Sequence, residues 1–265
     1  MLFRSLPVYC LFIVQTTLYG AFEGLPISGK TSALAHATTA GDPASEQIFF
    51  NPAGIGSSVQ CSMGQLFGLK DLRYMTLSAA MENRIGCMGA GFQMLGHPLY
   101  KEWQLLFALS RPVTETCRIG LCLHTMGLQI ERYGSAATWQ IDIGWRYDIN
   151  NRLSSGGSIT NISRQTIGQR KEKLPQISRF GFQFVPADQC RILVEVMKDA
   201  RYPMEWKCAA ACGIISEFEL LCGFVQNPAT ITGGFALHLR KLSLEYGAMI
   251  HPVLGLTHTF TFGLR

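Results

Sequence analysis

Hydrophobic and polar residues alternate along most of the chain, from about Val59 to the end. In ATWQIDIGWRYD, at 137–148, the odd-numbered positions are apolar and nearly all the even-numbered ones are polar. A period of two places successive side chains on opposite faces of a β-strand. Trp and Tyr toward the ends with Ile at the centre are typical of a strand that crosses a membrane. A half-buried strand of a soluble sandwich would alternate in the same way.

Similar segments of about 9 to 11 residues recur and are separated by Gly, Pro, Asn and Asp. They predict an all-β fold, an antiparallel transmembrane β-barrel of about 14 strands over residues 59–265. Connections after even-numbered strands are expected to be short, as in MENR, DINN, PADQ and IISE. The longest loop is expected at about Ser163 to Lys173, and RPVTET at 111–116 fits this alternation less well.

The composition agrees with a membrane barrel. Charged residues make up 15% of the 265 residues and hydrophobic residues 48%, which leaves few charges for the surface of a soluble enzyme. Outside the N-terminus, no apolar run approaches the roughly 18 to 20 residues of a membrane helix. A barrel explains both facts, because it turns one apolar face to outer-membrane lipid and closes its backbone hydrogen bonds on itself. The net charge of +5 is too mild to indicate nucleic-acid binding.

The first residues indicate export. MLFRSLPVYCLFIVQTTLYGA has an early Arg4, an apolar stretch from Leu6 to Val14 and small residues at Gly20 and Ala21. This pattern predicts a signal peptide over 1–21, with a first buried strand or a short anchor as the alternative. The predicted location is the bacterial outer membrane.

Residues 24–31, GLPISGKT, satisfy the phosphate-loop pattern. That loop needs a buried strand before it and a helix after it, so that backbone N–H groups converge on phosphate. Here the preceding segment is the predicted signal peptide, and no alternation of strands and helices follows. We therefore reject nucleotide binding and predict no cofactor.

Cysteines and histidines give no recognisable catalytic or metal site. The eight cysteines after Cys10 show no CxxC spacing, and Cys208 and Cys212 on one strand would be about 13 Å apart, too far for a disulfide. We interpret most of them as small hydrophobic residues. Cys122 and His124 are two ligands and do not make a metal site. The remaining histidines are scattered, so a barrel enzyme such as a phospholipase is disfavoured.

Two stretches carry a family resemblance. TSALAHATTAGDPASEQIFFNPAGIGSS, with helix-start signals at Thr31 and Asp42, resembles the N-terminal region of the PorV/PorQ family, within the long-chain fatty-acid transporter-like outer-membrane proteins. The ending HPVLGLTHTFTFGLR is similar as well. The resemblance implies a fourteen-stranded barrel whose partly helical N-terminal segment, 22–58, folds into the lumen as a plug.

The resemblance also implies a function. Asn51, Pro52 and Ala53 match the element that acts as a hatch in fatty-acid transporter-like proteins, although a tight turn joining the plug to the first strand would use the same residues. PorV/PorQ proteins are associated with type IX protein secretion, which predicts exported proteins or secretion components as partners. The alternative is a channel for hydrophobic small molecules. Both functions are non-enzymatic.

The last residues, THTFTFGLR, alternate up to the end of the sequence. We expect this strand to pair with the first one and close the barrel. The terminal strand also resembles an assembly signal for the barrel assembly machinery, with Phe260 and Phe262 as its aromatic residues and Arg265, not an aromatic residue, at its end.

Overall fold

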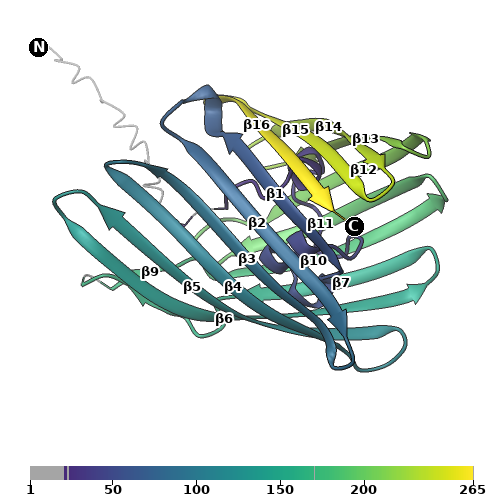
Figure 1. Ribbon diagram of the computed structural model, residues 1–265, viewed down its shortest axis with the longest axis horizontal. Helices are drawn as coiled ribbons and strands as arrows, with labels where there is room; N and C mark the ends of the chain where they lie inside the picture. The colour runs from purple at the N-terminus through teal and green to yellow at the C-terminus, as the bar shows by residue number, and fades with distance from the viewer. Residues whose placement is uncertain (1–20, 23, 170, 265) are drawn as a thin grey trace, which may run out of the picture.

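The structure is a computed structural model that describes residues 21–22, 24–169 and 171–264. Fourteen antiparallel strands form one closed barrel, which confirms the predicted fold class (Figure 1). The barrel strands are β1 (Ser58–Gln65), β2 (Arg73–Asn83), β3 (Gly86–His97), β4 (Tyr100–Pro112), β5 (Cys117–Ile130), β6 (Gly134–Asn150), β7 (Leu153–Thr160), β10 (Ile177–Ala187), β11 (Cys190–Asp199), β12 (Glu205–Ile215), β13 (Phe218–Val225), β14 (Thr230–Leu239), β15 (Leu242–His251) and β16 (Gly255–Leu264). The predicted signal peptide lies outside the described residues, apart from Ala21.

The faces of the strands follow the period of two seen in the sequence. In β6, Trp139 points outward and is 50% exposed, whereas Gln140 points into the lumen and is 2% exposed. The outward residues of the other strands are likewise apolar and exposed, among them Phe180, Phe182 and Phe260. This arrangement puts an apolar band around a polar interior, as in barrels that cross a lipid bilayer.

The two rims of the barrel differ in their connections. At one rim, the short-turn rim, the strands are joined by 84–85, 113–116, 151–152, 188–189, 216–217 and 240–241. The opposite, long-loop rim carries the longer connections 66–72, 161–176 and 200–204. The RPVTET stretch therefore contains the longest turn of its rim. Short turns face the periplasm in bacterial outer-membrane barrels.

Short elements interrupt the loops and the N-terminal segment. They are α1 (Gly29–Ala33), the 3-10 helices η1 (Ser45–Phe49), η2 (Pro52–Gly54) and η3 (Leu66–Gly68), and the hairpin β8 (Thr166–Ile167) and β9 (Glu172–Lys173). Among the described residues, no helix combines the length and apolar character needed to span a membrane. The hairpin lies in the longest loop, where the sequence predicted no strands, because two residues are too short to show a period.

The predicted helix starts were wrong in detail. Helix α1 begins at Gly29, because the Ser28 hydroxyl accepts a hydrogen bond from the Thr31 amide and the Thr31 hydroxyl accepts one from the Ser28 amide. Thr31 is thus the third residue of a capping box, not the start of the helix. Asp42 caps no helix, since η1 begins only at Ser45.

The first and last strands close the barrel, as predicted. In the seam, β1 pairs with β16 so that Val59 lies opposite Leu264 and Met63 opposite Phe260. Phe260 and Phe262 both point outward and are exposed. The sheet therefore has no free edge at the point where the chain ends its last strand.

Candidate functional site: the plugged lumen

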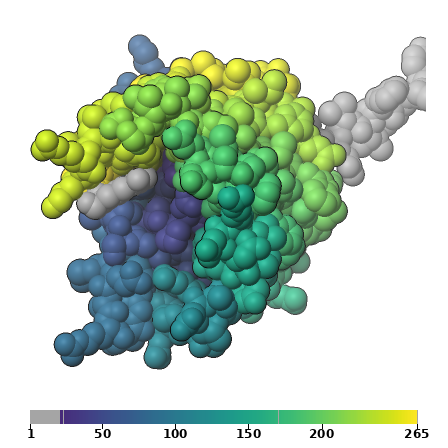
Figure 2. Space-filling model, turned by 90° about the vertical axis from the view of Figure 1, so that its right-hand side faces the viewer, coloured from purple at the N-terminus to yellow at the C-terminus, as the bar shows by residue number. Residues whose placement is uncertain are grey.

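Residues 21–57, here called the plug, fold back into the lumen (Figure 1), apart from Glu23, which is not described. Figure 2 looks into the short-turn rim and shows the purple plug inside the ring of strands. Ala33 of α1, with Leu34 and Ala37 after it, packs against inward-facing wall residues, which include Ala209, Ala211 and Ala236. Small wall residues at these positions leave room for the plug.

The phosphate-loop-like residues belong to the plug. Gly29 lies so close to the wall that a Cβ atom on it would be 2.8 Å from the carbonyl carbon of Glu245. Its amide donates to the Thr261 hydroxyl at 2.8 Å, and the Lys30 amide donates to Glu245 Oε2 at 3.1 Å. The first-turn amides of α1 are therefore engaged with the barrel wall, and these residues anchor the plug.

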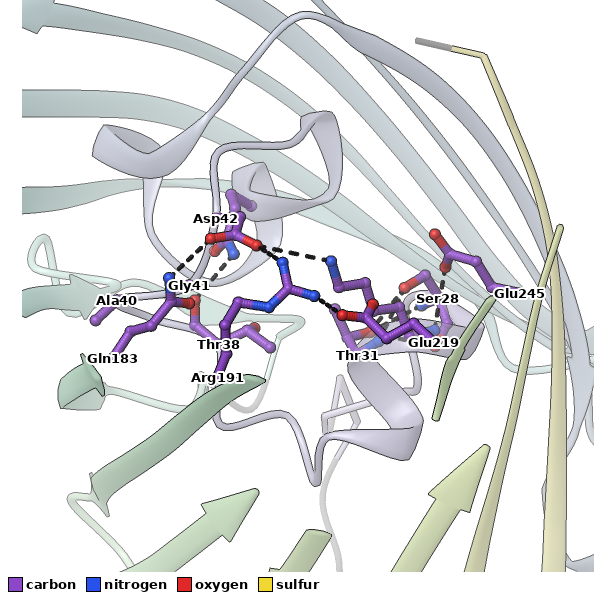
Figure 3. Close-up of polar contacts among 12 residues, drawn as sticks. Ser28, Thr31, Thr38, Ala40, Gly41, Asp42, Gln183, Arg191, Glu219 and Glu245 are labelled. Atoms are coloured by element: carbon purple, nitrogen blue, oxygen red, sulfur yellow. Dashed lines mark hydrogen bonds and ion pairs between the residues drawn. The ribbon is translucent and has the colours of Figure 1, made fainter. Parts of the chain in front are cut away.

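A cluster of charged groups, here called the latch, joins the plug to the wall near the short-turn rim (Figure 3). Asp42 of the plug accepts from Arg191 of β11 and, at 2.7 Å, from the Gln183 side-chain amide of β10. Arg191 also donates to Glu219 of β13. Lys30 Nζ lies 4.0 Å from Asp42 Oδ2. Because Asp42 belongs to the plug, and Gln183 and Arg191 belong to the wall, the latch holds this part of the plug in place.

Burial and charge set the ionisation of the plug. Burial raises the pKa of Asp42, but the Lys30 and Arg191 cations and the Gln183 amide outweigh it, so the pKa is lowered and the carboxylate stays charged. Burial, and then the Arg191 cation, lower the pKa of Lys30. Burial also lowers the pKa of His36 to about 3, with help from the Lys207 and Arg179 cations. His36 is therefore neutral at physiological pH.

The candidate hatch residues lie inside the lumen, against β5 and β6. Asn51 is fully buried, and its side-chain amide donates to the carbonyl oxygens of Thr39 at 2.8 Å and Trp145 at 2.9 Å. Its Oδ1 atom accepts from the Ala53 amide at 3.0 Å and caps η2, with Pro52 as the first residue. Asn51 thus ties two parts of the plug to the wall. Asn51 and Pro52 open a short 3-10 turn inside the lumen, and the hatch role stays a prediction.

Two wall glycines make this contact possible. A Cβ atom on Gly144 would lie 2.1 Å from Asn51 Oδ1, and one on Gly120 would lie 2.3 Å from the Ala53 nitrogen. On the outer face of the same wall, a groove of about 650 Å³ is lined by both glycines and by Trp145 and Phe180. Only backbone separates the plug from the outside at this point. Sequence reasoning missed both glycines, although glycine inside a strand signals close backbone approach.

Further contacts hold the loop between the latch and α1. Arg146 of β6 donates to the carbonyl oxygens of Ala40, at 2.9 Å, and Gly41. Glu195 of β11 accepts from the Thr39 amide at 3.0 Å. The sequence placed Arg146 and Glu195 on the lumen face but gave no sign of what they bind.

Near the long-loop rim, the plug ends in an apolar cluster. Phe22 packs with Met126 of β5, Ile167 of β8 and Leu174. The Phe22 amide donates to Glu102 Oε2 of β4 at 3.1 Å. By contrast, a cavity of about 440 Å³ beside the latch is lined by charged groups that include Lys30, Asp188 and Glu245. The lumen is thus apolar at one end and charged at the other.

Among the described residues, no three His, Cys, Asp or Glu side chains are placed to hold a metal ion. Cys122 and His124 both face the lumen, but the ring nitrogens of His124 contact Asp142 Oδ2 at 3.2 Å and Gln104 Oε1 at 2.8 Å. Sequence reasoning missed this network, which fixes the histidine between β4 and β6.

No model of a known protein family matches the chain, and no curated protein matches it. Solved structures do match its fold. The toluene transporter TodX of Pseudomonas putida has a TM-score of 0.67 at 9% identity, covering 89% of this chain and 96% of its own. The CymD monoaromatic hydrocarbon channel has a TM-score of 0.65 at 11% identity, covering 90% and 96%. A Pseudomonas aeruginosa FadL homologue has a TM-score of 0.59 at 9% identity, covering 90% and 98%.

At these identities, the likeness shows the fold alone. It agrees with the predicted resemblance to fatty-acid transporter-like barrels, and the matched structures are channels and transporters rather than enzymes. The more specific PorV/PorQ relationship and the link to type IX secretion stay predictions from the sequence. The chain shares its fold with the toluene transporter TodX and with the FadL homologue.

Proposed function

We propose that the protein is an outer-membrane channel for hydrophobic small molecules, closed at rest by its N-terminal plug. The observation that carries this proposal is the plug itself, which occupies the lumen between an apolar cluster at the long-loop rim and a charged latch at the short-turn rim. Hydrocarbon channels and transporters share the fold, which supports this function over protein secretion.

The apolar cluster suits the entry of a hydrophobic molecule. Phe22 is buried among Met126, Ile167 and Leu174, and burying such side chains stabilises the docked plug by about 1.5 to 3 kcal/mol per residue. A hydrophobic molecule that took the place of Phe22 would recover a similar free energy. Binding at this end would therefore weaken the docking of the plug.

The contacts at the other end suit release. The latch and Asn51 hold the plug by hydrogen bonds and ion pairs, and water can satisfy the same groups once the plug moves. Opening would thus exchange partners at these groups, and it would also separate Leu34, Ile48 and Ile55 of the plug from the apolar side chains of the wall. Binding of a hydrophobic molecule in the lumen would offset part of that cost.

The experiment measures flux of the fluorescent probe N-phenyl-naphthylamine into proteoliposomes. We expect wild-type protein to admit the probe faster than protein-free liposomes, and a variant lacking residues 24–56 to admit it faster still. A polar dye of similar size reports general leakage. Equal probe flux with wild-type protein, the plug-deleted variant and empty liposomes would overturn the proposal.

A secretion role would give a different result. The long-loop rim offers one long connection, 161–176, for binding an exported protein. Recovery of exported proteins through this loop, without any probe flux, would favour the type IX prediction over the channel.

A further inference from the structure

We propose that Cys190 and Cys212 form a disulfide bond that ties β11 to β12 at the short-turn rim. The two cysteines lie directly opposite each other in the sheet, and their sulfur atoms are 3.1 Å apart. A disulfide bond is about 2.05 Å long, so the sulfurs need to approach by about 1 Å. Small side-chain rotations can supply this.

The backbone at this pair also suits a disulfide. The Gly213 amide donates to the Gln189 carbonyl oxygen at 2.7 Å, so the neighbouring pair in the ladder is hydrogen-bonded. Hydrogen-bonded and non-hydrogen-bonded pairs alternate along an antiparallel ladder, which makes Cys190 and Cys212 a non-hydrogen-bonded pair. In such pairs the Cα atoms are about 4.5 Å apart, within the range that disulfides span.

The pairing is particular to these two residues. Of the eight described cysteines, no other has a cysteine directly opposite it. Cys208 and Cys222 are exposed on neighbouring strands, but Cys208 lies opposite Phe224 and Cys222 opposite Ala210. This pair is two residues out of register and provides a natural comparison. The sequence suggested no partner for Cys212. It shows how far apart Cys208 and Cys212 lie on one strand, but not which residue of the neighbouring strand lies opposite Cys212.

Both thiols lie where a soluble oxidant can reach them. Cys190 is the first residue of β11, next to the two-residue turn 188–189, and both cysteines are partly exposed. With the outer-membrane location of the proposed function, this rim faces the periplasm, an oxidising compartment. The oxidant is a periplasmic protein that carries a reactive disulfide.

The exchange proceeds in two steps. The thiolate of one cysteine attacks a sulfur of the donor's disulfide, which breaks the donor S–S bond and leaves a mixed disulfide and one donor thiol. The second cysteine thiolate then attacks the mixed disulfide, forms the Cys190–Cys212 bond and releases the second donor thiolate. The two cysteines lose two electrons and two protons, and the donor gains both as a dithiol.

The bond would brace the latch. Arg191, which follows Cys190, points to the opposite face and binds Asp42 of the plug. Cross-linking the strand start to β12 limits the movement of the backbone that carries this guanidinium. The disulfide would thus hold a wall residue of the latch in position.

Thiol counting on the protein recovered from isolated outer membranes, without the predicted signal peptide that contains Cys10, tests the proposal. The sample is acid-quenched, denatured and labelled with a maleimide, with and without prior reduction. We expect six labelled thiols without reduction and eight after it, from the eight cysteines of the described chain. C190S and C212S should each label all seven remaining thiols without reduction, whereas C208S should label five.

A linked peptide identifies the partners. Trypsin should release 180–191 joined to 208–240, and fragment ions should place the bond at Cys212. Eight labelled thiols in unreduced wild type, or protection that survives in C190S, would overturn the proposal. Fractionation and heat-modifiable gel migration report location and folding separately, so a failure of the channel proposal and a failure of the disulfide give different results.

Discussion

Substitution of Asn51 tests most directly whether hydrogen bonds hold the plug in the lumen. Replacing Asn51 by Ala removes three hydrogen bonds, two from its amide to Thr39 and Trp145 and one from the Ala53 amide to its Oδ1 atom. Only the bond to Trp145 joins the plug to the wall, so its loss weakens plug docking by about 1 kcal/mol, while the other two losses loosen the plug itself. Since about 1.4 kcal/mol is a factor of ten, the undocked fraction should rise about 5-fold.

Two measurements follow this change. Hydrogen exchange of the Ala53 amide should accelerate, because its acceptor is gone. Probe flux into proteoliposomes should rise in proportion, as long as the undocked state remains the minor one. Gln140→Ala is the matched control: Gln140 is also buried, but its side-chain amide donates to His124 Nδ1 at 2.9 Å and Asp142 Oδ1 at 3.2 Å, which both belong to the wall.

The control separates plug release from general loosening of the protein. Q140A should leave both the Ala53 exchange rate and the probe flux near the wild-type values. If N51A left them unchanged as well, Asn51 would not hold the plug. If exchange accelerated without any rise in flux, the plug would not be the barrier to the probe.

Three further predictions concern the latch, pH and the seam. Asp42→Asn should weaken plug docking by about 1 to 2 kcal/mol, a modest loss because the Asp42 side chain is 37% exposed. Amide exchange across the plug should accelerate. Unchanged exchange would contradict the role of the latch. The pKa of His36 is lowered from 6.5 to about 3 in the docked plug, so docking favours the neutral imidazole. The free energy that His36 contributes to docking is therefore complete above pH 6.5 and declines by at most about 1.4 kcal/mol per pH unit as the pH falls toward 3. Amide exchange across the plug, measured at pH 7 and 5, should show weaker docking at pH 5 in wild type and a smaller change in His36→Asn. Asn tolerates the left-handed backbone of this position. Equal changes in the two proteins would refute the role of His36. Deleting 257–265 removes the partner of β1 and should abolish heat-modifiable gel migration, whereas assembly of the shortened chain would argue against the seam.

The barrel could be predicted because the pattern of each strand depends only on the surroundings of that strand. Each strand carries its own period of two, and lipid on one side with a polar lumen on the other enforces that period at every position, as Trp139 and Gln140 show. The pairing of the last strand with the first also follows, since a membrane barrel tolerates no free edge. The short helices were harder to predict. The sequence offered helix-start signals at Thr31 and Asp42, whereas the residue that caps α1 is Ser28.

The plug contacts could not be predicted, because no local pattern connects a plug residue with its partner in the wall. Asp42 meets Arg191 across 149 positions of sequence, and Asn51 meets Trp145 across 94. The resemblance placed Asn51, Pro52 and Ala53 in the lumen but named none of their partners. A second signal was present, since Gly120 and Gly144 interrupt strands that are otherwise rich in large side chains.

The seam has a consequence for the order in which the protein folds. Val59 and Leu264 lie opposite each other, so the ring cannot close until the last strand has been synthesised. Pairings between residues so distant in sequence form slowly, and the strands that wait for them expose edges that favour aggregation. The plug, in contrast, precedes β1 and is made first. The barrel therefore has to wrap around a segment that was already present, so closure of the ring and enclosure of the plug are one and the same step.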